Sequence, residues 1–236
     1  MAELPGAANV RRAMGRRRRL RRGLVSALVV ALVAATVWAV GFSPLLAVRQ
    51  VRVDGATIVT ADDVRAAAQV PMGTPLARLD TATIAGKVTS ALPAVASATV
   101  SRHWPGTLVI TIKQRVIVFQ VSQGGLFHWV SADGVDFNAT PDKQAAVTVA
   151  VALGSQALLA AVATVVQATP PEVASHVQSM SAASLDSITL LLDGGRQVVW
   201  GSADQSDLKA EVIVALLANV KGKVYDISAP SNPAVR

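Results

Sequence analysis

The sequence predicts an α+β protein with a single N-terminal transmembrane helix and two small mixed α/β domains beyond it. Three observations predict this architecture. An uncharged apolar stretch covers Gly23–Leu46, strand-like and helix-like hydrophobic periods alternate in the rest of the chain, and Gly and Pro clusters separate them. We therefore divide the chain into an Arg-rich cytoplasmic tail (1–22), a transmembrane helix (23–46), a first exported domain (47–115) and a second exported domain (116–236).

The apolar stretch is long enough to cross a membrane. At about 1.5 Å per residue, its 24 residues span about 36 Å as a helix, which exceeds a hydrocarbon core of about 30 Å. Eight arginines precede it, whereas Arg49 and Arg52 are the first charged residues after it, so we expect the N-terminus in the cytoplasm. The arginines that we expect to act as the topology signal are Arg16, Arg17, Arg18, Arg19, Arg21 and Arg22.

A cleaved signal peptide is the alternative interpretation, and Val37-Trp38-Ala39 loosely imitates a cleavage site. The apolar region of a signal peptide has about 7–15 residues, so the length of this stretch favours an uncleaved anchor. The rest of the chain is then exported. Because the chain has no cysteine, no disulfide framework supports the exported part.

The basic net charge does not indicate nucleic-acid binding. The net charge of +7 is already present in residues 1–22, and the remaining 14 basic and 14 acidic residues cancel. A domain that grips phosphates normally carries a basic patch on its folded surface, so we expect no nucleic-acid partner.

The first exported domain is predicted to have the element order β-α-α-β-β. The stretch VRQVRVDG is typical of a strand ended by Asp54-Gly55, and Thr60 with Asp63 forms a capping box for a short helix. A second helix is expected to begin near Asp80 and to end before Pro93. Two strands follow, in VASATVSR and TLVITIKQR, separated by a turn at Trp104-Pro105-Gly106.

The second exported domain is predicted to be a mixed α/β domain with an antiparallel sheet. Gln156–Gln167 indicates a helix, and Glu172–Met180 is expected to add a helical turn. Ser202–Gln205 matches a capping box that would begin another helix, with Leu208, Val212, Ala215 and Leu216 facing inward. Hairpin signals lie at Gly124-Gly125, Asp133-Gly134 and Asp193-Gly194-Gly195.

The ordered set of motifs resembles the FtsQ/DivIB family of bacterial cell-division proteins. The motifs are VRQVRVDG, ALPAVASATVSRHWPGTLVITIKQR, SADGVDF at 131–137, VVWG at 198–201 and VYDISAPSNPAVR. Each motif alone is unspecific, whereas their order is specific and covers essentially the whole chain. The resemblance implies a POTRA domain over 47–115 and an FtsQ-type β domain over 116–236.

The resemblance also implies a function. Members of this family are divisome scaffolds, bitopic membrane proteins that link early and late division proteins and help to control septal peptidoglycan assembly at the division site. The implied partners are small bitopic coiled-coil division proteins of the FtsB/DivIC and FtsL types, and other divisome members. The implied location is the cell membrane, concentrated at the septum, and no cofactor is implied.

Two residues depart from the family's usual pattern. Gln114 stands where the family usually has an acidic residue before Arg115, and Ile117 stands where a proline is common. Because both lie where the two exported domains join, we expect the departures to affect the angle between the domains.

No set of residues predicts catalysis or a metal site. His103, His128 and His176 are scattered, without the spacing of metal ligands. Ser206 and Lys209 match the S-x-x-K motif of penicillin-recognising enzymes, but the S-D-N and K-T-G elements are absent. We interpret Ser206 and Lys209 as the first turn of a surface helix, and we predict that the protein is not an enzyme.

The predicted binding site is the last strand. A final strand often lies at a sheet edge, where a partner can add a strand of its own. In the family the last strand of the β domain takes a partner strand, and the matching residues here are Val224, Tyr225, Asp226, Ile227 and Ser228. The alternative is that Pro230 and Pro233 protect this edge, because proline cannot donate to a ladder and should leave the tail unable to pair regularly.

Two other functions remain as alternatives. POTRA domains also receive client chains in export and assembly systems, but those proteins carry a large barrel, and about 120 residues are too few for 16 strands of about ten residues. A membrane-anchored cell-wall hydrolase would need a catalytic constellation that the sequence does not contain.

Overall fold

The computed structural model describes residues 24–39 and 44–236. Residues 24–39 are helical and their side chains are exposed. Within the described ranges, no helix has both the length and the apolar character that a membrane crossing requires. The predicted topology signal, Arg16 to Arg22, lies outside the described residues. The predicted transmembrane segment (23–46) is described only in part, and its last three residues, Pro44–Leu46, form a 3-10 helix, η1.

The N-terminal domain has the predicted β-α-α-β-β order. Its elements are β1 (Gln50–Asp54), α2 (Ala61–Ala68), η2 (Leu76–Arg78), α3 (Thr81–Ala91), β2 (Val95–His103) and β3 (Thr107–Gln114). The central strand β3 pairs in parallel with β1 and antiparallel with β2. The predicted capping box of Thr60 and Asp63 begins α2, and the Asp80 carboxylate caps α3.

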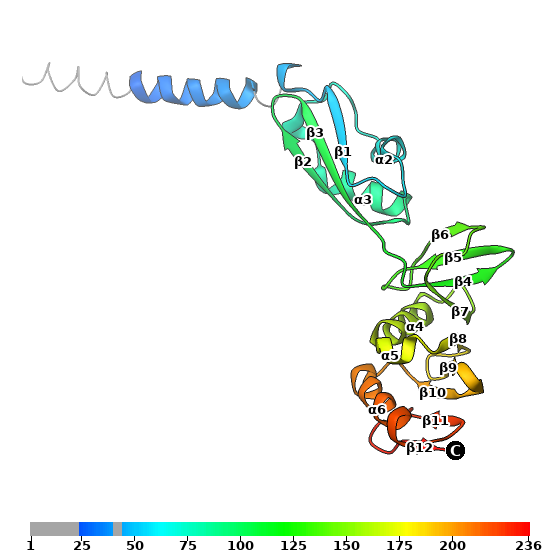
Figure 1. The fold of residues 1–236 in the computed structure, drawn as a ribbon. Coiled ribbons are helices and arrows are strands. Elements are labelled where there is room, and N and C mark those ends of the chain that lie inside the picture. The colour runs from blue at the N-terminus through cyan, green and yellow to red at the C-terminus, as the bar shows by residue number, and fades with distance from the viewer. Residues whose placement is uncertain (1–23, 40–43) are drawn as a thin grey trace, which may run out of the picture.

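The two helices cover one face of this three-stranded sheet (Figure 1). Leu108 and Ile110 of β3 are fully buried against Val64 of α2 and Val88 of α3. The opposite face of the sheet carries polar side chains and remains open to solvent. An amphipathic sheet with one covered face is the arrangement that the alternation in the sequence predicts.

The C-terminal domain is built on a nine-stranded sheet with the order β12-β11-β10-β9-β8-β7-β4-β5-β6. Figure 1 shows α4, α5 and α6 on one face of this sheet, and β12 at the end farthest from the N-terminal domain. The strands are β4 (Phe119–Gln123), β5 (Leu126–Val130), β6 (Asp136–Thr140), β7 (Val147–Val151), β8 (Val177–Ala182), β9 (Ile188–Leu192), β10 (Gln197–Gly201), β11 (Val224–Asp226) and β12 (Ala234–Val235). The helices are α4 (Gln156–Ala168), α5 (Pro171–Ala174), the 3-10 helix η3 (Asp193–Gly195) and α6 (Ser206–Asn219).

The expectation of an antiparallel sheet was wrong, because the sheet is mixed. The pairs β4–β7, β7–β8 and β10–β11 are parallel. Helices connect β7 to β8 and β10 to β11, and a helical crossover returns the chain to the same end of the sheet, so the next strand runs in parallel. The three predicted hairpin signals are confirmed as the antiparallel turns β4–β5, β5–β6 and β9–β10.

Two local predictions in this domain were wrong. The helical turn expected over Glu172–Met180 ends at Ala174, and strand β8 follows. Helix α6 does not use a Ser202 cap, because its N-cap is Gln205, with a φ of 53° and no side-chain cap bond. Its buried residues are Ser206, Lys209, Ala210 and Ile213. Of the four residues predicted to face inward, Val212 and Leu216 pack against the core, whereas Leu208 is 45% exposed and Ala215 is also exposed.

Arg115 connects the two domains. Its backbone N–H donates to Ala94 O at 2.9 Å and its Nε donates to Pro93 O at 2.8 Å, both in the N-terminal domain. Its guanidinium also donates to the Asp133 carboxylate and, at 3.4 Å, to Ser131 Oγ, in the turn between β5 and β6. The side chain of Arg115 is only 15% exposed, less than any other arginine of an ion pair in the described residues, whereas its partner Asp133 is 54% exposed.

The same contacts affect the titration of Asp133. Burial alone would raise the pKa of Asp133, but hydrogen bonds from Ser131 and Arg115 outweigh burial and lower this pKa below its usual value. The contact therefore contributes fully above the ordinary aspartate pKa of about 3.9, and its contribution is lost as pH falls through the lowered folded-state pKa.

We predict that Arg115→Met widens the range of angles between the two domains. The methionine keeps the backbone bond but loses every guanidinium bond across the junction. Distances between spin labels on single cysteines in the two domains, measured by pulsed electron paramagnetic resonance, should become broader. Arg52→Met is the matched control, because Arg52 is 66% exposed and pairs only with Asp54 in its own strand. Equal distance distributions in the wild type and Arg115→Met would contradict this role.

Candidate partner-binding edge

The predicted site lies at one end of the nine-stranded sheet. Strand β11 pairs in parallel with β10, with Val198 opposite Tyr225 and Val199 opposite Asp226. Helix α6 connects the two strands and packs against the sheet, since Ile213 is fully buried in the same core as Tyr225. The connection is short, since the C-cap of α6 is Val220 and β11 begins at Val224.

Tyr225 and Ile227 face the core and hold β11 in place. Tyr225 is 2% exposed and Ile227 is fully buried. The Tyr225 hydroxyl donates to Val220 O at 2.9 Å and accepts from Gly222 N–H at 3.1 Å, which fixes the loop between α6 and β11. The Ile227 N–H donates to Val199 O at 3.0 Å. These two residues therefore do not present side chains to a partner.

Val224, Asp226 and Ser228 lie on the other face. The Asp226 carboxylate accepts from the Ser228 hydroxyl at 2.7 Å and from the Ser228 N–H at 3.1 Å. The bond from the Ser228 side chain is the largest cause of a lowered pKa of Asp226, followed by the bond from the Ser228 backbone. Ser228 also packs closely against Gly201, where a Cβ would lie 2.8 Å from Ser228 Cβ and the φ of 77° favours glycine.

The open edge of the sheet is β12, not β11 as expected. Tyr225 pairs with Val235 and Asp226 pairs with Ala234. The backbone bonds at this end join Val224 N–H to Arg236 O at 3.0 Å and Arg236 N–H to Val224 O at 2.9 Å. The expectation that the prolines prevent regular pairing was also wrong. Pro230 lies in the turn between the strands and Pro233 immediately precedes β12, so neither removes a donor from the ladder.

On its outer side, β12 presents the backbone N–H and C=O of one residue, Val235. Successive residues of an antiparallel strand direct their N–H and C=O groups to opposite sides. Because the Arg236 groups bond to β11, the N–H and C=O of Val235 face away from the sheet. The Val235 side chain packs over Gly222, where a Cβ would lie 2.3 Å from Val235 Cγ1. The opposite edge, β6, is longer and carries Asp136, whose carboxylate pairs with His128 Nδ1 at 2.8 Å.

Ser206 and Lys209 hold the beginning of α6 against β10. The Ser206 hydroxyl donates to Ala203 O at 2.8 Å and accepts from Trp200 Nε1 at 3.1 Å. Lys209 is 1% exposed and its Nζ donates to Ser202 O at 2.8 Å, while burial lowers its pKa. The expected position on the surface was wrong, because the long aliphatic part of lysine can lie in a core while its amine reaches a polar group.

The three histidines lie apart from one another. His128 pairs with Asp136, His176 Nδ1 lies 2.6 Å from an Asp193 carboxylate oxygen, and His103 lines the open face of the N-terminal sheet. Within residues 24–39 and 44–236, no three His, Asp or Glu side chains are grouped as metal ligands would be.

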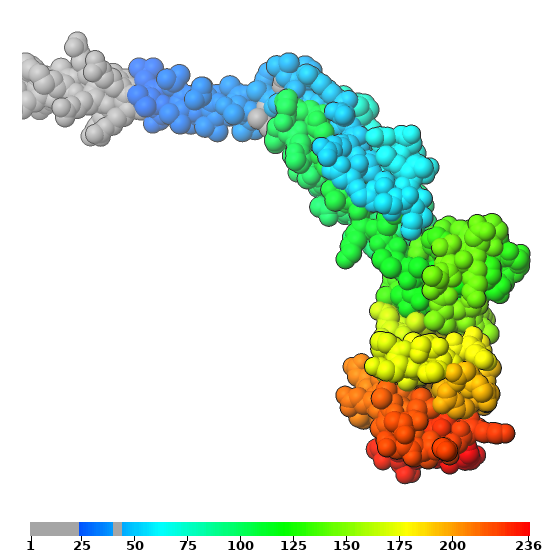
Figure 2. Space-filling model, in the orientation of Figure 1, coloured from blue at the N-terminus to red at the C-terminus, as the bar shows by residue number. Residues whose placement is uncertain are grey.

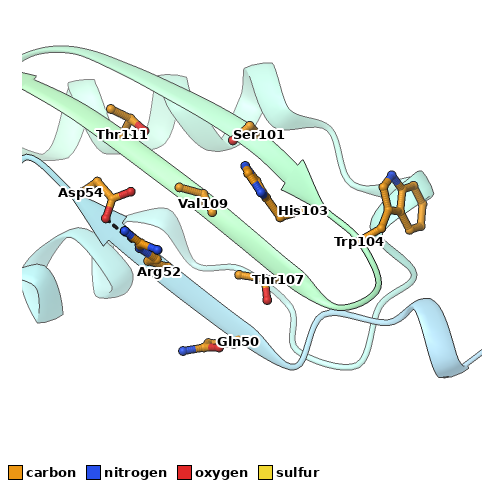
Figure 3. A pocket seen from close by; sticks show the side chains of 9 residues that line it. All are labelled: Gln50, Arg52, Asp54, Ser101, His103, Trp104, Thr107, Val109 and Thr111. Carbon is orange, nitrogen blue, oxygen red and sulfur yellow. Dashed lines mark hydrogen bonds and ion pairs between the residues drawn. The ribbon is translucent and has the colours of Figure 1, made fainter.

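The open face of the N-terminal sheet forms a shallow concavity (Figure 3). Four of its nine lining side chains carry a hydroxyl or an amide, and Arg52 and Asp54 form an ion pair at 2.9 Å along β1. Trp104 lies at the turn between β2 and β3, beyond the ends of the strands, and is 50% exposed. The lining residues are Gln50, Arg52, Asp54, Ser101, His103, Trp104, Thr107, Val109 and Thr111.

Comparison with known proteins agrees with both domains. Residues 46–115 match the family described as POTRA domain, FtsQ-type, and residues 120–228 match the family described as Cell division protein FtsQ/DivIB, C-terminal. A cell division protein FtsQ from Streptomyces venezuelae is 35% identical over 213 residues, which cover 85% of this chain and 78% of the relative. The chain belongs to the FtsQ/DivIB family of cell-division proteins.

Mycobacterial relatives in this family are longer. The cell division protein FtsQ of Mycobacteroides abscessus is 39% identical over 197 residues, which cover 83% of this chain and 63% of the relative. That of Mycobacterium tuberculosis is 39% identical over 202 residues, which cover 84% of this chain and 63% of the relative. The chain therefore spans less than two thirds of the length of these relatives.

Gln114 preserves an acceptor where the family usually has an acidic residue. Its Oε1 accepts from the Ile58 N–H at 2.8 Å and from the Thr57 hydroxyl, whereas its Nε2 is buried without a hydrogen-bond partner. Both contacts lie within the N-terminal domain. The departure at Gln114 therefore acts on the loop between β1 and α2, and the contacts across the junction belong to Arg115.

We predict that Tyr225→Phe lowers the free energy of unfolding by about 0.5–1.5 kcal/mol, because it removes part-buried hydrogen bonds to the Val220 C=O and the Gly222 N–H. Urea unfolding of the full chain, followed by tryptophan fluorescence, measures this loss. Ser228→Ala is the control and should cost less, because its exposed hydroxyl bonds only to Asp226. Equal stability of Tyr225→Phe and the wild type would show that the hydroxyl does not fix the loop.

Proposed function

We propose that this chain is a divisome scaffold, a single-pass protein of the cell membrane concentrated at the division septum. It links early and late division proteins, helps to control septal peptidoglycan assembly, and performs no chemistry itself. Membership of the FtsQ/DivIB family supports the role in division. The observation that carries the scaffold role is the short, open β12 edge, because an open sheet edge can take a strand from a partner.

The membrane anchor in this proposal is residues 23–46, with the N-terminus in the cytoplasm. The sequence there has no ionisable side chain, and its described part, residues 24–39, is a helix with exposed apolar side chains such as Leu28 and Leu32. The arginine run of residues 16–22 supports the orientation, because positive charges are retained on the cytoplasmic side.

We expect an alkaline phosphatase fused after Arg236 to be active in cells, since this enzyme works only outside the cytoplasm. Replacing Arg16, Arg17, Arg18, Arg19, Arg21 and Arg22 with Ser should reduce that activity, because the charge difference across the anchor is then largely removed. Fusion to a reporter that works only in the cytoplasm is the reciprocal control. Activity of the cytoplasmic reporter at Arg236 in the unmodified chain would reverse the proposed topology.

The proposed partners are small bitopic coiled-coil division proteins of the FtsB/DivIC and FtsL types. A segment of such a partner would extend the sheet beside β12, where Val235 supplies one donor and one acceptor. Strand addition of this kind obtains affinity from backbone hydrogen bonds and specificity from alternate side chains. The edge is short, so the adjoining residues Val224, Asp226 and Ser228, on the face away from the core, would supply side-chain contacts.

We predict that Val235→Pro strongly reduces recovery of these partners when the full-length protein is purified from its native membrane and analysed by mass spectrometry. Proline removes the outward N–H of residue 235 but leaves the bonds of Arg236 to β11. Val235→Thr is the matched control, because it keeps the N–H and a branched side chain. Circular dichroism checks that both variants fold. Undiminished recovery with folded Val235→Pro would move the interface away from β12.

A further inference from the structure

Three exposed apolar side chains gather at one end of the N-terminal domain. Leu45 of η1 is 68% exposed, Met72 in the loop after α2 is 56% exposed, and Trp104 in the β2–β3 turn is 50% exposed. We call these three residues the apolar rim. They come from separate parts of the sequence, so their arrangement depends on how the backbone brings three segments together.

Backbone hydrogen bonds join the three segments around residues 47–50. Val48 exchanges bonds with the loop that carries Met72, from Gly73 N–H at 3.0 Å and to Thr74 O at 2.9 Å. Arg49 N–H donates to Gly106 O at 2.8 Å, which ties the Trp104 turn to the same segment. Gly106 permits this close approach, because a Cβ there would lie 3.0 Å from Ala47 O. The rim is therefore part of the folded domain.

The charged residues within the three segments are all basic, and the nearest acidic residue in the sequence, Asp80, caps α3 and interacts with Arg102. The three segments 44–49, 71–78 and 102–106 contain Arg49, Arg78 and Arg102 and no Asp or Glu. Arg102 uses its guanidinium on Leu76 O and Leu79 O at 2.8 and 2.6 Å, whereas Arg49 is exposed beside Leu45. An apolar tip surrounded by arginines is complementary to an anionic lipid surface.

The chain holds the rim close to the proposed anchor. Only residues 40–43 separate the described helix from Pro44, and five Cα–Cα steps span at most about 18 Å. If the helix crosses the membrane, η1 with Leu45 lies at the outer end of the anchor, and the backbone bonds of residues 48–50 hold the Met72 and Trp104 segments beside it. The remainder of the domain extends the other way, since β3 runs from Thr107 at the rim to Gln114 at the junction. Figure 2 shows the N-terminal domain, in cyan to green, between the blue helix and the C-terminal domain.

We propose that the apolar rim docks on the outer surface of the membrane, with an anionic phospholipid bilayer as its binding partner. Trp104, Met72 and Leu45 enter the interfacial layer, where a tryptophan ring finds both apolar and polar surroundings. Arg49 and Arg78 lie at the level of the headgroups. This proposal rests on the membrane anchor proposed above, and it adds that the domain is held against the membrane in one orientation.

The absence of cysteine from the chain allows a direct test with single-cysteine variants. The full-length Met72→Cys protein, labelled with the fluorophore NBD and reconstituted in vesicles of phosphatidylethanolamine and phosphatidylglycerol, should show blue-shifted emission and loss of intensity with lipids that carry a shallow quencher. The matched control is Ile58→Cys. Ile58 is 42% exposed in the same domain but lies at the opposite end of the sheet, beside Gln114. Identical emission and quenching at the two positions would overturn the proposal.

A second variant excludes insertion driven by the fluorophore alone. Leu45→Ser with Trp104→Ser in the Met72→Cys protein should lose the blue shift, because the label then lacks its apolar neighbours. A blue shift that persists in this variant would assign the effect to the fluorophore and would overturn the proposed membrane contact of the apolar rim. In vesicles of phosphatidylcholine alone the shift should be smaller, since Arg49 and Arg78 then lack anionic headgroups. A blue shift of the Met72→Cys label in native membranes but not in these vesicles would indicate a protein partner in place of the bilayer and would overturn the proposal.

A label at Leu32→Cys separates this proposal from the anchor. Quenching at Leu32 by a deep quencher, without quenching at Met72, would leave the anchor intact and overturn the rim alone. A Leu32 label that stays in water would overturn the anchor and the rim together. Quenching at both positions, deep at Leu32 and shallow at Met72, is the expected result.

Discussion

The nine-stranded sheet is open, and an open sheet leaves backbone N–H and C=O groups unpaired along both outer strands. At one end this cost is reduced by making the outer strand, β12, only two residues long. The inner neighbour β11 is fixed independently of β12, through Tyr225, Ile227 and the parallel pairing with β10. The edge can therefore accept a partner strand without loss of the core behind it, and this property underlies the proposed scaffold role.

The two proposed contact surfaces lie at opposite ends of the two folded domains. The apolar rim lies where β3 begins, Arg115 follows the end of β3, and β12 is the last strand beyond it (Figure 1). In the proposed scaffold, the orientation of the proposed membrane-bound end is transmitted to the proposed partner-binding end only if the junction is stiff. The Arg115 bonds to Pro93, Ser131 and Asp133 provide that stiffness, because they join both domains through one shielded guanidinium.

Local sequence signals predicted much of the fold, whereas long-range pairing was not predictable. The Thr60 capping box and the Asp193-Gly194-Gly195 hairpin follow from contacts between residues close in sequence. Strand β8, the parallel pairings and the return of the tail as β12 depend on tertiary partners. The buried Lys209 was missed because a charged residue is expected outside, and its acceptor, Ser202 O, is a backbone group without a sequence signature. In the candidate site, strand β11 was predicted, but β12 as the outermost strand was not.

The most direct test of the account is hydrogen–deuterium exchange of the full chain, purified alone and together with its native membrane partners. The account predicts that the peptide over residues 230–236 becomes protected in the complex, since the outward N–H of Val235 gains an acceptor, while the peptide over β6 at the other edge exchanges as before. Unchanged exchange over residues 230–236 in a complex that contains the partners would contradict it.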